Sequence, residues 1–66
     1  MACTGYEHGS RVELIQALSN ANVPLGAVGR VVAINRNDHL IDVVFDVFGL
    51  FRNLDPHSFR LLSMLA

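Results

Sequence analysis

The stretch between residues 28 and 46 constrains the fold most, because it reads as two strands joined by a tight turn. Residues 28–34 are rich in β-branched side chains, and residues 35–39, Asn-Arg-Asn-Asp-His, have the composition of a turn. In residues 40–46, Ile41, Val43 and Phe45 alternate with Asp42, Val44 and Asp46. A period of two is typical of a half-buried strand. We therefore expect an antiparallel hairpin. Its core face carries Ile41, Val43 and Phe45, and its solvent face carries Asp42, Val44 and Asp46.

A strand and a long loop are expected before this hairpin. In residues 11–17, Val12 and Leu14 alternate with polar residues as in a half-buried strand, and a helix extending to Leu18 is the alternative. Residues 19–26 contain two Asn, one Pro and one Gly, which favours turns and interrupts helices. This composition predicts a loop that returns the chain to the hairpin.

The chain after the hairpin predicts two short strands separated by one helical turn. Residues 47–54 are mostly apolar, and Gly49 marks a bend or bulge in a second hairpin or an edge strand. The pair Asp55-Pro56 is typical of a helix N-cap followed by the first helical position. It predicts a 3₁₀ turn near Asp55–Phe59, with a final short strand over residues 59–62.

Three segments carry a resemblance to known small barrels. They are residues 9–15 (Gly-Ser-Arg-Val-Glu-Leu-Ile), residues 26–34 (Gly-Ala-Val-Gly-Arg-Val-Val-Ala-Ile) and residues 41–45 (Ile-Asp-Val-Val-Phe). Together they resemble the SH3-like barrel superfamily. Its members include KOW-type ribosomal and transcription modules, the stromal SH3-like subunit of photosystem I, the variable chain of ferredoxin–thioredoxin reductase, and small bacterial and phage proteins.

The resemblance covers roughly residues 9–62 and concerns the scaffold. It implies an all-β fold, a small five-stranded SH3-like barrel. We expect a flexible leader over residues 1–9, the barrel over residues 10–62 and a C-terminal tail over residues 63–66. A chain of 66 residues leaves room for only one domain, and 52% hydrophobic against 17% charged residues excludes disorder. Without a signal peptide or an apolar run of membrane-spanning length, a cytoplasmic location is expected.

No spacing in the sequence indicates catalysis, a cofactor or a metal. Asp42 and Asp46 lie roughly 13 Å apart on an extended strand, too far for a pair of glycosidase carboxylates. Cys3 has no basic neighbour that would activate its thiol. The histidines lack the spacing of a metal site; they are His8, His39 and His57. We therefore expect a protein that is not an enzyme.

The apolar residues between positions 44 and 51 exceed what a small barrel can bury. Exposed apolar patches usually mark a protein interface, so the sequence predicts a protein-interaction or assembly module, either a homo-oligomer or bound to a protein partner. A simpler alternative is that residues 20–25 fold over this surface. The predicted interface residues are Val44, Phe48, Leu50 and Phe51.

Two other functions remain as alternatives. A KOW-like or Sm-like module would bind nucleic acid through Arg11, Arg30, Arg36 and Arg60. The net charge of −1 and the scatter of these residues count against it, so we do not expect nucleic-acid binding. The second alternative is a pore-type oligomeric enzyme resembling type II dihydrofolate reductase, but the Val-Gln-Ile-Tyr stretch of that family's pore is missing.

Overall fold

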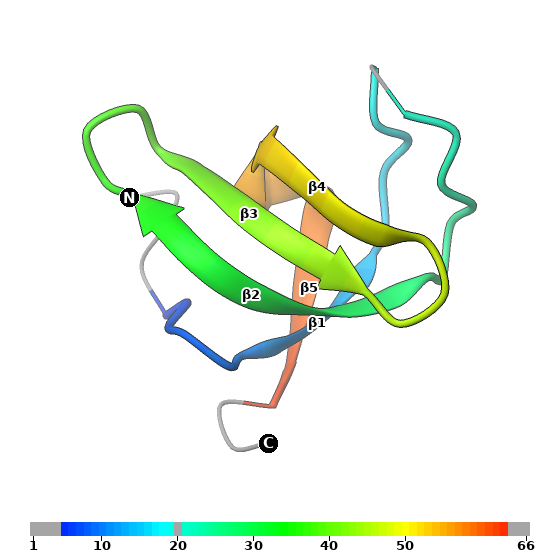
Figure 1. The fold of residues 1–66 in the computed structure, drawn as a ribbon, viewed down its shortest axis with the longest axis horizontal. Helices are drawn as coiled ribbons and strands as arrows, with labels where there is room; N and C mark the ends of the chain where they lie inside the picture. Colours follow the sequence, from blue (N-terminus) through cyan, green and yellow to red (C-terminus); the bar gives the residue numbers. More distant parts are fainter. Residues whose placement is uncertain (1–4, 20, 64–66) are drawn as a thin grey trace.

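In the part of the chain that the structure describes, the fold is one antiparallel sheet of five strands with a single 3₁₀ turn (Figure 1). The computed structural model describes residues 5–19 and 21–63. The five-stranded sheet confirms the predicted all-β fold. The described residues form no helix long and apolar enough to cross a membrane. The elements are β1 (Arg11–Leu14), β2 (Val28–Asn35), β3 (Leu40–Phe45), β4 (Gly49–Leu54), η1 (Pro56–Ser58) and β5 (Phe59–Ser63).

The hairpin expected from the alternating residues is formed by β2 and β3, and its register pairs Val31 with Val43. Its turn is closed by the Asn35 side chain, whose Oδ1 accepts hydrogen bonds from the backbone N–H groups of Asn37 and Asp38, each at 3.1 Å. Such side-chain turns are why Asn is common between strands. The predicted core face is confirmed, since Ile41, Val43 and Phe45 are all buried.

The strands follow the order β4-β3-β2-β1-β5, so β2 lies at the centre and β4 and β5 lie at the edges. The register shifts once in three of the four pairings, β1–β5, β2–β3 and β3–β4. Such bulges increase the local twist of a sheet and bend it. In Figure 1 the curled sheet places β3 and β4 in front of β5. The enclosed core consists of Tyr6, Val12, Leu14, Val23, Val31, Ile41, Val43, Phe45, Leu54 and Phe59.

The first strand is shorter than predicted, and the alternative helix through Leu18 is absent. β1 ends at Leu14, whose backbone exchanges hydrogen bonds with Gly26 and Ala27 across the base of the loop. The next two backbone N–H groups, of Ile15 and Gln16, both donate to the carbonyl oxygen of Ser58 in η1. The chain therefore leaves the sheet after Leu14, because its backbone groups bond to another element.

The segment before β1 contributes to the core, although its sequence predicts a loose leader. Tyr6 is buried, and its hydroxyl donates to the carbonyl oxygens of Pro56 and Phe59 at 3.0 and 3.1 Å. The backbone N–H of Gly9 donates to the carbonyl oxygen of Val31 at 2.8 Å. Residues 5–9 are thus attached to the barrel at both ends of this segment.

Candidate functional site

The outer surface of β3 and β4 carries exposed apolar side chains. Val44 and Leu50 are partners in the β3–β4 register, so their side chains share one face of the sheet. Val44 is 38% exposed and Leu50 is 55% exposed. Phe48, in the turn that joins the two strands, is 44% exposed. We call Val44, Phe48 and Leu50 the outer patch.

The structure places Phe51, the fourth predicted interface residue, on the opposite face. Phe51 pairs with Val43 in the register, and both side chains face the core because their neighbours Val44 and Leu50 face outward. The Phe51 ring meets Phe45 edge to face, with centroids 5.6 Å apart. Phe51 is only half-buried, and its remaining surface belongs to a cleft rather than to the outer patch.

The alternative cover for the outer patch was residues 20–25, and the described part of this segment, residues 21–25, lies elsewhere. In the described part of this loop, Val23 is buried in the core and Ala21 packs against it. Ala21 also lines the cleft beside Phe51, on the inward side of β4. The loop therefore covers the Phe51 side of the sheet and leaves Val44 and Leu50 exposed.

Ion pairs occupy several charged residues around the sheet. The Arg11 guanidinium donates to both carboxylate oxygens of Asp46, at 3.1 and 2.9 Å. This bidentate hydrogen bonding lowers the pKa of Asp46, and it raises the pKa of Arg11. Asp42 was expected on the solvent face, and the structure shows it half-buried. Its Oδ1 accepts a hydrogen bond from the Asn53 backbone N–H at 2.9 Å, and its Oδ2 lies 3.5 Å from the Arg52 Nε.

The four arginines considered for nucleic-acid binding do not form one free cationic cluster. Arg11 is paired with Asp46, and Arg60 donates to Glu13 from its Nε at 3.2 Å. Arg30, on β2, lies opposite Arg11 of β1 and Val44 of β3 in the register. Its charge attracts the Asp46 carboxylate without a hydrogen bond and so helps to lower the pKa of Asp46. Arg36 lies apart, in the turn after β2.

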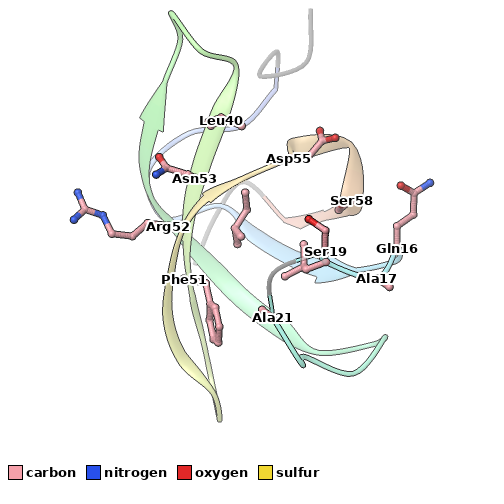
Figure 2. Close-up of a pocket in the computed structure, with 12 residues that line it drawn as sticks. Gln16, Ala17, Ser19, Ala21, Leu40, Phe51, Arg52, Asn53, Asp55 and Ser58 are labelled. Carbon is pink, nitrogen blue, oxygen red and sulfur yellow. The ribbon is translucent and has the colours of Figure 1, made fainter.

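A cleft of about 550 Å³ lies between the β1–β2 loop and β4 (Figure 2). Phe51 and Leu54 line it from β4, and Leu18 lines it from the loop. The cleft arises from two segments that meet only in the folded chain, so no local pattern in the sequence predicts its shape. The sequence features associated with it are the length of the loop and the polar residues around the end of β4, Arg52, Asn53 and Asp55. The lining residues are Gln16, Ala17, Leu18, Ser19, Ala21, Leu40, Phe51, Arg52, Asn53, Leu54, Asp55 and Ser58.

The groups that could carry acid–base or metal chemistry are dispersed over the described residues. No three His, Cys, Asp or Glu side chains among them come close enough to hold a metal ion. His8 and His39 are exposed, and His57 lies beside Asp55, with its Nδ1 3.3 Å from Oδ1. Cys3 lies outside the described residues.

Comparison with known proteins places this geometry in a family. A family model described as the Xrn1 SH3-like domain matches residues 4–50, which is more than two thirds of the chain. The match runs from the segment before β1 to the start of β4, so it covers the central hairpin and the long loop. No curated protein and no solved structure matches the chain.

Proposed function

Because the chain belongs to the Xrn1 SH3-like domain family, a family of generally non-catalytic interaction modules, we propose that it is a protein-interaction module that binds a second copy of itself. The contact surface in this proposal is the outer patch, Val44, Phe48 and Leu50. The observation that carries the proposal is the outward pairing of Val44 and Leu50 on neighbouring strands. Neither the loop nor any other described segment covers them.

The size of the patch indicates a weak association. Burying one fully exposed large apolar side chain contributes about 1.5–3 kcal/mol. The patch residues are already about half-buried, so the three from each copy together contribute about 4–8 kcal/mol, which only reaches the lower part of the cost of about 4–15 kcal/mol for joining two molecules. We therefore expect an equilibrium between monomer and dimer that depends on concentration. A permanent dimer would need a larger buried surface.

Size-exclusion chromatography with light scattering, run over a wide range of concentrations, tests this proposal. The wild-type mass should rise toward that of a dimer as concentration increases. Leu50→Asp and Phe48→Asp should each hold the mass at that of the monomer, because a carboxylate in the patch would have to be desolvated on association.

A matched control is Leu25→Asp, since Leu25 is 62% exposed but lies in the β1–β2 loop, away from the outer patch. This variant should associate like the wild type. A wild-type chain that stays monomeric at every concentration would contradict self-association, and so would equal effects of Leu50→Asp and Leu25→Asp.

A further inference from the structure

The cleft beside β4 is lined by four consecutive residues of that strand, Phe51 to Leu54. Phe51 and Leu54 both face the core side, because β4 bulges between them at Asn53, where φ is 59°. Arg52 and Asn53 line the cleft as well, so it extends beyond the inner face to the backbone between those two side chains. Figure 2 agrees with this geometry, because the Arg52 side chain extends away from the cleft while the Phe51 side chain lies along it. The cleft therefore follows the edge of β4.

That edge has no backbone partner among the described residues. β4 pairs only with β3, since it stands at the end of the strand order. The backbone hydrogen bonds found outside the strand ladders include none from Gly49–Leu54 to the facing loop. A free edge presents N–H and C=O groups that can pair with another extended chain.

The opposite wall of the cleft is held in place at its base. It is formed by residues 16–19 of the loop, and the Gln16 N–H is anchored on the Ser58 carbonyl oxygen at 3.2 Å. Leu18 and Phe51 pack against the core and give the cleft an apolar floor. Two walls of backbone above such a floor suit an extended segment with alternating side chains.

The charges on the rim favour a cationic occupant. Two charged residues line the cleft, Arg52 and Asp55. The Arg52 guanidinium lies outside the cleft, where its Nε is 3.5 Å from the Asp42 Oδ2. Asp55 uses one oxygen, Oδ1, to cap η1 by accepting from the His57 N–H, and the His57 Nδ1 lies 3.3 Å from the same oxygen. No described group binds its Oδ2. The charge on the rim that an occupant would complement is therefore the Asp55 carboxylate.

We propose that this cleft binds an extended peptide segment of a partner protein, which pairs with the free edge of β4 and places a Lys or Arg side chain against Asp55. Pairing would stop near Asn53, where the backbone turns to φ 59° and the N–H is already bonded to Asp42. The basic side chain then extends past this point toward η1. This surface is separate from the outer patch, so either proposal can fail without the other.

The probes are three short capped peptides of alternating Thr and Val. One carries a central Arg, one has Gln in its place, and one has the Arg and N-methyl groups on alternate backbone nitrogens. Each is titrated into ¹⁵N-labelled protein and followed by two-dimensional NMR. The Arg peptide should shift the amide signals of Ala17, Leu18 and Phe51–Leu54. N-methylation should weaken binding at least about tenfold, because it removes the donors that pair with the edge.

Two variants test the walls and the charge. Asp55→Asn keeps an N-cap residue of equal quality but removes the carboxylate, so the Arg peptide should bind about two- to fivefold more weakly while the Gln peptide is unaffected. Ala17→Trp should block the cleft from an exposed position. Asn22→Trp, on the same loop but outside the cleft, should bind like the wild type.

Several outcomes would overturn the proposal. They are the absence of saturable shifts at Phe51–Leu54 with the Arg and Gln peptides, equal binding of the N-methylated peptide, and shifts centred on Val44 and Leu50. A preference of the cleft for single-stranded RNA over all three peptides would also exclude a peptide site.

Discussion

At the scale of single residues, Gly29 shows how closely β2 and β3 approach each other. A Cβ atom at this position would lie 2.7 Å from the Val43 Cγ1 atom and 2.7 Å from the Val44 carbonyl oxygen. The second of these atoms belongs to the backbone, so it cannot move without disturbing the ladder. The glycine at position 29 is therefore required by packing, and no ligand is needed to explain it.

We expect Gly29→Ala to lower the free energy of unfolding by about 1–3 kcal/mol, the usual cost of forcing an extra group into a packed core. Urea denaturation followed by circular dichroism measures this difference. Gly9→Ala is an informative comparison, because that site has open space but a φ of 87°, so its cost is conformational. A Gly29→Ala midpoint equal to that of the wild type would contradict the close approach.

Tyr6 supports a second prediction at this scale. Its hydroxyl donates to the carbonyl oxygens of Pro56 and Phe59, and it ties the segment before β1 to η1. Tyr6→Phe keeps the ring but removes the donor, so we expect a loss of about 1–2 kcal/mol in the free energy of unfolding. Hydrogen exchange should show faster opening of residues 5–9 in this variant. Unchanged exchange there would mean that the ring alone holds the segment.

At the scale of elements, the Arg11–Asp46 ion pair joins β1 to the end of β3 across the central strand. Hydrogen bonding to Arg11 lowers the pKa of Asp46 in the folded chain. A carboxyl group with a lowered folded pKa stabilises the fold above its unfolded pKa, and this contribution is lost as pH falls through the folded pKa. The pKa of Arg11 is raised, so its contribution would be lost only in strongly alkaline solution.

We therefore expect Asp46→Asn to lower the melting temperature slightly at neutral pH. The difference from the wild type should shrink once pH falls below about 4, where an unfolded Asp titrates, and disappear below the lower pKa of Asp46 in the folded chain. Thermal melts across this range measure it, with Glu7→Gln as the control, because Glu7 is exposed and no described group bonds to its side chain. A difference that persists in strong acid would show that the carboxylate charge is not its cause.

At the scale of the whole molecule, the two proposed binding surfaces lie on opposite faces of β4. Leu50 faces outward beside Val44, and Phe51 faces the core and the cleft. Because adjacent residues of a strand point in opposite directions, neighbouring positions in the sequence serve different surfaces. Partners could therefore occupy the outer patch and the cleft at the same time.

Charge pairing over the whole surface predicts weak binding to nucleic acid. Two of the four candidate arginines, Arg11 and Arg60, are bonded to carboxylates. We expect affinity for single-stranded RNA at physiological salt to be weaker than the roughly 10⁻⁴ to 10⁻⁶ M typical of non-specific binding to DNA. Fluorescence anisotropy with a labelled RNA measures this affinity.

The matched variant is the double substitution Glu13→Gln and Asp46→Asn, which frees both arginines without adding a cation. It should strengthen RNA binding and steepen its dependence on salt. Tight, salt-dependent binding by the wild type would contradict the prediction and revive the nucleic-acid alternative.

Much of the fold could be read from local patterns. The alternation at Ile41, Val43 and Phe45 predicted which face is buried, and Asp55-Pro56 predicted the 3₁₀ turn. These features depend on residues close together in the chain, so a single sequence contains the information. Of the predicted interface residues, Val44, Phe48 and Leu50 are exposed, and their role in an interface stays a prediction.

Periodicity and turn chemistry are local, so the order of the strands, the turns and the apolar excess near β4 could be predicted from the sequence. Three features depend on tertiary contacts instead. Phe51 lies on the core side because of the β4 register, Tyr6 is buried by contacts about fifty residues away, and the path of the loop follows from the hydrogen bonds of Ile15 and Gln16 to Ser58. The cleft follows from the same cause, since its two walls become neighbours only when the loop packs over the core.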